Sequence, residues 1–173
     1  TEHTPAALLA NDIVIVTFNG LSKAYRIPGY RSGWMVISGA KSSARDYIDG
    51  LKILAAMRLS SNVPGQLAIQ TSLGGHQSII ELTSANGRLT LQRNHFYKGI
   101  TNIPGISCVK PKGAFYLFPK LEPKQFCIFN DEKLIMDLLI NQKILLVQGT
   151  AFNCNDTNHF RIVFLPHVDQ IRT

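Results

Sequence analysis

Cysteine is scarce in this chain, whose 173 residues contain only Cys108, Cys127 and Cys154. Their number is odd and none of them forms a Cys-x-x-Cys pair, which argues against both a disulfide framework and a zinc site. The five histidines show no metal-ligand spacing either, so we predict no metal site. Reduced thiols of this kind indicate a cytoplasmic protein.

Long apolar runs and basic blocks are also missing. No run approaches the roughly 18 apolar residues of a membrane helix, and no basic-then-apolar signal peptide opens the sequence. The formal net charge is +7, but the positive residues form no block interleaved with aromatic residues. Such a diffuse excess suits acidic small molecules or a phosphate group, so we expect neither a nucleic-acid nor a membrane partner. A hydrophobic content of 45% and a charged content of 17% predict a globular protein with a core.

The most informative segment is 19–34, which reads Asn-Gly-Leu-Ser-Lys-Ala-Tyr-Arg-Ile-Pro-Gly-Tyr-Arg-Ser-Gly-Trp. Apolar runs at 13–16 and 35–37 flank it, and short runs rich in β-branched residues predict strands buried on both faces of a sheet. Glycine and proline in the connection leave no room for a crossover helix, so we expect the strands to be antiparallel. Lys23 then lies just past a strand end, where open α/β sheets bind ligands.

Lys23 and Arg31 are the candidate reactive and anion-binding residues of this segment. An amine in a dry site loses its charge more readily and can attack a carbonyl group. Arg31 follows eight residues later between Gly29 and Gly33, and its planar guanidinium suits phosphate or carboxylate. An aldehyde that carries a phosphate needs both groups. The alternatives are a solvated surface lysine and a structural ion pair at Arg31.

The pattern Ser-Lys-x-Tyr-Arg-x-x-Gly-x-Arg-x-Gly-Trp resembles the cofactor-lysine segment of fold-type I aminotransferases of class I/II. The form Asn-Gly-Leu-Ser-Lys is most similar to their glutamate–pyruvate (alanine) branch. The resemblance implies that Lys23 is catalytic and carries pyridoxal 5'-phosphate as a Schiff base, while Arg31 binds the cofactor phosphate. Many relatives have a phosphate-binding serine where this chain has Gly20, so we expect Ser22 to take over part of that contact.

Residues 111–119 are similar to the Pro-x-Gly-Ala-x-Tyr-x-Phe stretch of the family's small domain. We interpret Phe115 and Phe118 as core residues of this stretch.

A second family-like segment is Phe160-Arg161-Ile162. Period-two alternation places Phe160, Ile162 and Phe164 on one strand face and Arg161 on the other. An arginine in an apolar strand must meet an anion or lose its hydration without compensation. The resemblance assigns Arg161 to the substrate α-carboxylate, and the alternative is an ion pair with an acid such as Asp156.

The remaining pattern predicts further helices and short strands. Apolar periodicity and breakers predict helices over 41–60, 64–75 and 77–103, the last interrupted at 86–87, and another that Asn130 caps. Strands are predicted at 106–109, at 114–118 as its partner, and at 144–147 and 159–164.

Together these features predict an α/β fold, the C-terminal part of a fold-type I pyridoxal-phosphate transferase. We assign residues 1–75 to the end of the large domain with its mixed sheet and 76–105 to a helical connection. Residues 106–173 form the small α+β domain, truncated at its end. Because no methionine opens the chain and it stops where a helix begins, we expect a fragment.

The resemblance implies transamination between an amino acid and a 2-oxo acid, in a homodimer when the protein is full length. The family's pyridine-nitrogen aspartate and stacking ring lie upstream, and nothing in 1–12 matches them, so we expect the fragment alone to be inactive. Three alternatives stay open. They are an aspartate or aromatic aminotransferase of the same fold, an aminotransferase-like effector domain of a transcription regulator, and a non-catalytic interaction module.

Overall fold

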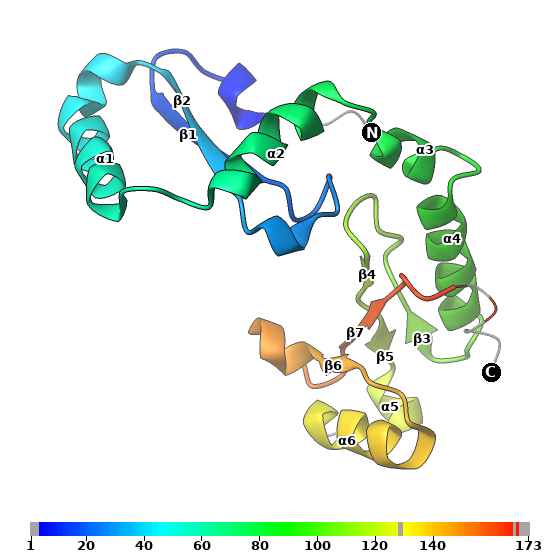
Figure 1. Cartoon of the computed structure of the whole chain (residues 1–173). Helices are drawn as coiled ribbons and strands as arrows, with labels where there is room; N and C mark the ends of the chain where they lie inside the picture. The colour runs from blue at the N-terminus through cyan, green and yellow to red at the C-terminus, as the bar shows by residue number, and fades with distance from the viewer. Residues whose placement is uncertain (1–3, 128–129, 168, 170–173) are drawn as a thin grey trace. The chain divides into compact units, whose positions relative to one another are not determined.

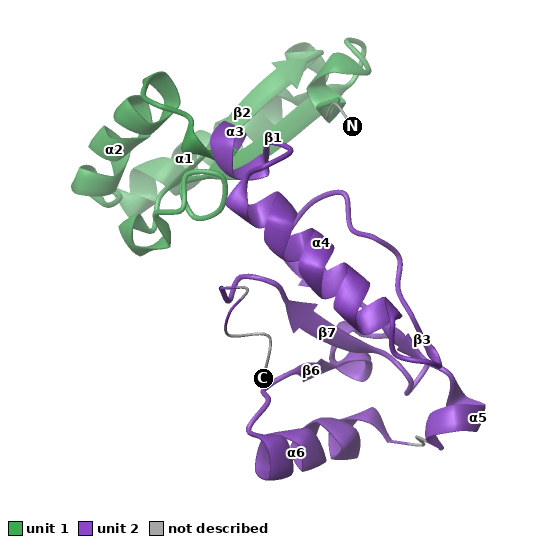
Figure 2. Cartoon of the chain, turned by 90° about the vertical axis from the view of Figure 1, so that its right-hand side faces the viewer, with its two compact units in different colours: residues 1–79 green, residues 80–173 purple. Residues whose placement is uncertain are grey.

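The computed structural model describes residues 4–127, 130–167 and 169. The chain divides into two compact units, 1–79 and 80–173, shown in green and purple in Figure 2, and each is described by itself. Both units combine helices with antiparallel strands (Figure 1).

The first unit is built on a β-hairpin. Strands β1 (Val14–Gly20) and β2 (Gly33–Gly39) pair antiparallel over their whole length, with Val14 opposite Gly39 and Gly20 opposite Gly33. The sequence-based prediction of antiparallel strands is therefore confirmed. The other elements of the unit are the 3-10 turns η1 (Ala6–Leu8), η2 (Pro28–Tyr30) and η3 (Lys41–Ala44) and the helices α1 (Arg45–Arg58) and α2 (Val63–Gly74).

The hairpin strands are not buried on both faces, contrary to the sequence-based prediction. Phe18 is 73% exposed and Val36 is 52% exposed. The reason is that β1 and β2 form a two-stranded sheet, and among the described residues no third strand pairs with either outer edge.

The second unit contains four helices among its described residues, of which the first begins two residues before the unit boundary. They are α3 (Ser78–Thr83), α4 (Arg88–Thr101), α5 (Pro123–Phe126) and α6 (Asp131–Gln142). Its strands are short: β3 (Ile106–Ser107), β4 (Tyr116–Leu117), β5 (Lys120–Leu121), β6 (Val147–Gln148) and β7 (Phe160–Val163). The 3-10 turn η4 (Gly149–Phe152) follows β6.

Strand pairing in this unit differs from the prediction that 106–109 pairs with 114–118. Strand β3 pairs with β5, whereas β4 joins a three-stranded sheet in the order β4-β7-β6. The pairing with β7 places Leu117 opposite Ile162 and buries the Leu117 side chain completely. Strand β4 therefore pairs with the strand that lets Leu117 be buried on the core face. It does not pair with β3, which is the nearest strand before it in the sequence.

The core of the second unit lies between β5, β7 and α6. Leu121, Ile135 and Phe160 form its buried centre, and partly buried hydrophobic residues pack around them: Ile100, Ile106, Phe126, Leu134, Leu138, Leu146 and Ile162. Phe118 does not belong to this core, since 39% of it is exposed. The prediction of core packing is therefore wrong for Phe118, whose side chain points to the opposite face of the sheet.

Within the described part of the chain, no helix has both the length and the apolar character that crossing a membrane requires.

Asn130 caps helix α6, as the sequence predicts. Its side-chain Oδ1 accepts a hydrogen bond of 2.9 Å from the backbone N–H of Lys133, and Asp131 and Glu132 occupy the favourable first turn.

We expect Asn130→Ala in the whole protein to lower the free energy of unfolding by about 1 kcal/mol, because one helix N–H loses its acceptor. Urea unfolding followed by circular dichroism measures the change. Asn130→Ser is the matched control, since a serine hydroxyl can replace the acceptor. Equal midpoints for the alanine and serine variants would contradict the capping role.

Candidate functional site

The loop after β1 presents Lys23 on a rigid turn. The backbone N–H of Leu21 donates to the carbonyl of Ser32 at 3.0 Å, and the N–H of Ile27 donates to the carbonyl of Leu21 at 3.1 Å. The N–H of Arg26 donates to the carbonyl of Lys23 itself at 3.0 Å. Because the side chain of Leu21 is completely buried, it anchors the turn while Lys23, two residues later, is exposed.

The expectation of a dry environment for Lys23 is not met by the residues that the structure describes. The lysine side chain is exposed because no described element of its unit covers it. Ser22 beside it is half-buried.

Arg31 closes the same loop. It adopts the left-handed backbone conformation (φ 47°, ψ 40°) at the end of η2, and its Nη1 donates to the carbonyl of Pro28 at 2.8 Å. This bond ties one edge of the guanidinium to the turn, and four of its five N–H groups remain. Arg31 makes no ion pair with any described residue, so the alternative of a structural ion pair is not observed.

Helix α2 and its N-cap residue contact the loop. The side-chain amide of Asn62 donates to the carbonyl of Tyr30 at 2.7 Å. Gly65 is buried, and a Cβ atom there would lie only 2.8 Å from the same carbonyl. Close approach of the helix to the loop therefore requires glycine at this position. Sequence reasoning missed Gly65, although a glycine directly after Pro64 in a first helical turn was a usable signal.

The hairpin also converges tightly where the loop begins and ends. A Cβ atom at Gly33 would lie 2.7 Å from the carbonyl oxygen of Asn19, and one at Gly20 would lie 3.2 Å from that of Ser32. Gly20, where the resemblance implies a serine in many relatives, thus has a backbone role of its own.

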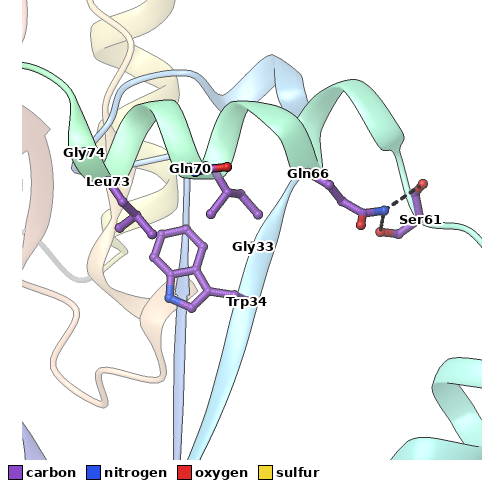
Figure 3. Close-up of a pocket in the computed structure, with 8 residues that line it drawn as sticks. Gly33, Trp34, Ser61, Gln66, Gln70, Leu73 and Gly74 are labelled. Carbon is purple, nitrogen blue, oxygen red and sulfur yellow. Dashed lines mark hydrogen bonds between the residues drawn. The ribbon is translucent and has the colours of Figure 1, made fainter.

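A shallow groove runs between β2 and α2 (Figure 3). Trp34 and Leu73 form its apolar part, and at one end Gln66 Nε2 donates to the hydroxyl of Ser61 at 2.9 Å. Neither Lys23 nor Arg31 lines it, so this groove is not the site that the two residues serve.

The donor set of the loop fits a phosphorylated aldehyde. Lys23 supplies a primary amine, Ser22 a hydroxyl and Arg31 a guanidinium, all within one turn closed by glycine at both ends. An amine reacts with an aldehyde, whereas hydroxyl and guanidinium groups are the usual ligands of phosphate.

Arg161 lies in the second unit, on β7, the central strand of its sheet. Its Nε atom is buried and has no hydrogen-bond partner among the residues that the structure describes. The guanidinium carbon lies 4.6 Å from the ring centroid of Tyr116 and 4.8 Å from that of Phe152. Asp156, the alternative partner, lies 3.8 Å from Lys120 Nζ instead.

Alternation along β7 is confirmed. Phe160 and Phe164 are buried, and Ile162 packs against the core, while Arg161 points to the other face. A partly buried guanidinium with an unpaired N–H on an otherwise aromatic surface can bind an anion.

Gly149 fixes the turn beside Arg161. Its N–H donates to the carbonyl of His159 at 2.8 Å, and a Cβ atom at Gly149 would lie 2.8 Å from the Cβ of His159. The glycine at 149 therefore fixes the strand-to-turn geometry.

The structure thus brings Ser22, Lys23 and Arg31 together in one loop of the first unit and places Arg161 in the second. Sequence reasoning missed Phe152 and the role of Tyr116 beside Arg161. Among the residues described, no three His, Cys, Asp or Glu side chains gather as a metal site would require.

Comparisons with known proteins match the whole described chain to one family. The model of the class I and II aminotransferases covers residues 1–171. The chain is 56% identical to the glutamate-pyruvate aminotransferase AlaA of Escherichia coli (strain K12) over 98% of its own length and 42% of that protein. It is 52% identical to an alanine aminotransferase of Mycobacterium tuberculosis (strain H37Rv), covering 95% of this chain and 38% of that protein.

The fold agrees with these relatives. The crystal structure of an aminotransferase from Escherichia coli superposes with a TM-score of 0.93 at 56% identity, covering 99% of this chain and 42% of that one. The chain therefore spans about two fifths of the length of the relatives that it matches.

The three cysteines are free and differ in environment. Cys127 is exposed, whereas Cys108 and Cys154 are half-buried. Burial raises the pKa of the Cys108 thiol above its ordinary value of 9.0, and a hydrogen bond from the backbone of Phe118 opposes the rise.

We expect iodoacetamide at pH 8 to alkylate Cys108 at least about threefold more slowly than Cys127, because the thiolate is the nucleophile and Cys108 is both shielded and protonated. The rate at Cys108 should keep rising as the pH is raised, because only the thiolate reacts and burial raises the pKa of this thiol. Peptide mass spectrometry follows both sites. In urea the two rates should converge, and equal rates in the folded protein would contradict the burial effect.

Proposed function

Because the chain belongs to the class I and II aminotransferases, we propose that the protein containing it transfers an amino group from an amino acid to a 2-oxo acid. The donors and acceptors are alanine and glutamate with pyruvate and 2-oxoglutarate. The observation that carries the proposal is the turn after β1, which combines an exposed primary amine with a hydroxyl and a guanidinium.

The choice of substrates rests on the relatives. The two relatives described above, which share more than half of their aligned residues with this chain, are named glutamate-pyruvate aminotransferase and alanine aminotransferase. An aspartate aminotransferase of Bacillus subtilis shares 33%. This difference favours the alanine branch over the aspartate branch.

Pyridoxal 5'-phosphate, when bound, supplies an aldehyde that captures the substrate amino group and a ring that takes up the electron pair left at the α-carbon. Lys23 holds the cofactor through its Nζ atom. Once the substrate amino group has replaced it there, the free amine of Lys23 would take up the α-proton as base and give it up again as acid. Ser22 and Arg31 bind the phosphate, where Arg31 uses the N–H groups that Pro28 leaves available.

Arg161 binds the α-carboxylate that all amino-acid substrates share. Its unpaired Nε and the in-plane Nη groups form a two-pronged contact, which orients the substrate for removal of the α-proton.

The rest of the protein completes the site. The exposed side chain of Lys23 needs a cover, and the chain spans only 42% of its relatives' length, so residues outside it provide the ring-stacking group and the partner of the pyridine nitrogen. We therefore propose that residues 1–173 alone do not catalyse transamination.

We propose the same domain division as the sequence indicates, with 1–75 in the cofactor-binding domain, 76–105 as connection and 106–173 in the small domain. The whole protein acts as a homodimer in the cytoplasm. The free state of all three cysteines supports a reducing compartment.

A screen of amino donors with the full-length protein, using pyruvate or 2-oxoglutarate as acceptor, tests the activity. In this assay Lys23→Ala should lower kcat by about a thousandfold or more, since both the attachment of the cofactor and the proton transfer are lost. Borohydride reduction followed by peptide mass spectrometry should label Lys23 in the native protein. A label on another lysine, or normal turnover of the variant, would overturn the assignment.

Arg31→Ala is the matched control within the same loop. It should keep the covalent label on Lys23 but lose the cofactor during dialysis, because a charge-assisted phosphate contact is removed.

We expect Arg161→Lys to raise KM about tenfold or more for alanine and glutamate alike, because lysine cannot reproduce the planar fork. Steady-state kinetics with several donors measures the effect. Arg88→Lys, which alters a guanidinium bound to the backbone of Leu165, should leave KM unchanged. A defect confined to one substrate would indicate side-chain recognition instead.

A further inference from the structure

We propose that Tyr116 and Phe152 are positioning residues that hold the guanidinium of Arg161 between two aromatic rings, and that Asp131 fixes Phe152 through Thr150. The inference rests on the proposed carboxylate-binding role of Arg161 and deepens it. It explains how a long, flexible side chain is ordered before the substrate arrives.

The first ring comes from β4. Tyr116 stands opposite Val163 on β7, and Val163 shares a strand face with Arg161 two residues away. Tyr116 and Arg161 are therefore diagonal neighbours, close enough for a cation–π contact, and their groups lie 4.6 Å apart.

The second ring comes from the other side of β7. Strand β6 pairs with β7 opposite to β4, and η4 directly after β6 carries Phe152 to 4.8 Å from the guanidinium carbon. Phe118 braces this ring by an edge contact, with centroids 6.1 Å apart at 84°. Phe118 itself stacks on His159, with centroids 5.2 Å apart.

A buried carboxylate holds η4 in place. Asp131 is only 3% exposed, and both of its oxygens accept from Thr150. Oδ2 accepts from the backbone N–H at 2.9 Å and Oδ1 accepts from the hydroxyl at 3.0 Å. Since Thr150 lies two residues before Phe152, this pair of bonds ties the aromatic ring to the start of α6.

Because the rings at 4.6 Å and 4.8 Å come from opposite sides of β7, we infer that they cover the guanidinium faces and leave its edge to an anion. Hydrogen bonds from a guanidinium lie in its plane, so an anion that approaches along the edge meets two parallel N–H groups, the geometry of a carboxylate. The rings also exclude water from the faces and reduce the rotamer freedom that binding would otherwise cost. The arrangement therefore strengthens carboxylate binding without taking part in proton transfer.

The test uses the full-length holoenzyme. Phe152→Leu and Tyr116→Leu should each raise KM for alanine and for glutamate about five- to tenfold, with kcat within about twofold of the native value. The inhibition constant of propanoate, a carboxylate without an amino group, should rise in parallel. Phe152→Tyr and Tyr116→Phe keep a ring at each position and should behave like the native enzyme.

A variant of Thr150 tests the pair of hydrogen bonds between Asp131 and Thr150. Thr150→Val removes the hydroxyl at nearly constant volume and should raise KM about threefold, whereas Thr150→Ser keeps the bond to Asp131 and should restore the native KM. An effect of Phe152→Leu on the melting temperature with unchanged KM would reduce the residue to a structural role and overturn the proposal. If Phe152→Leu does not fold, Tyr116→Leu tests the same contact from the other side of β7.

The two aromatic rings around Arg161 are called the clamp here. Failure of the clamp and failure of the proposed function give different results. If Arg161→Lys raises KM but both ring variants leave it unchanged, the clamp is wrong and the carboxylate role stands. If Arg161→Lys leaves KM unchanged, Arg161 does not bind the substrate carboxylate, and the proposed role of the two rings is then wrong as well.

Discussion

Alternation of side chains along β7 is the constraint on which the second unit depends. Phe160 and Phe164 are committed to the core, so Arg161 between them must face the other way. A guanidinium in the central strand of a sheet cannot be left without compensation, because losing its hydration is costly. Two aromatic rings supply part of that compensation, and the Nε, which has no partner among the described residues, can donate to an anion.

The first unit differs, because the exposed amine of Lys23, the proposed cofactor-binding group, stands in a short connection between two strands. The two strands approach closely at Gly20 and Gly33, which closes the loop. The completely buried side chain of Leu21 anchors it. The exposed lysine then needs no partner within its own turn. Backbone hydrogen bonds determine where its Cα lies, and the side chain stays exposed.

Features that depend on neighbouring residues can be predicted from the sequence. Features that depend on contacts between distant residues cannot. The antiparallel hairpin, the cap at Asn130 and the alternation around Arg161 follow from turn residues, side-chain acceptors and period two. The partner of β4 does not follow from such rules. A strand of two residues does not specify its own register, so the burial of Leu117 sets it.

The candidate site divides in the same way. Lys23, Ser22 and Arg31 are close in sequence and carry a recognisable spacing, so they can be found without a structure. The surroundings of Arg161 come from four separate segments, namely β4, α6, η4 and β7. No spacing rule connects Asp131 to Phe152, since their link passes through the hydroxyl of Thr150. Residues that touch a ligand leave a pattern in the sequence more readily than residues that hold them in position, because the latter depend on packing alone.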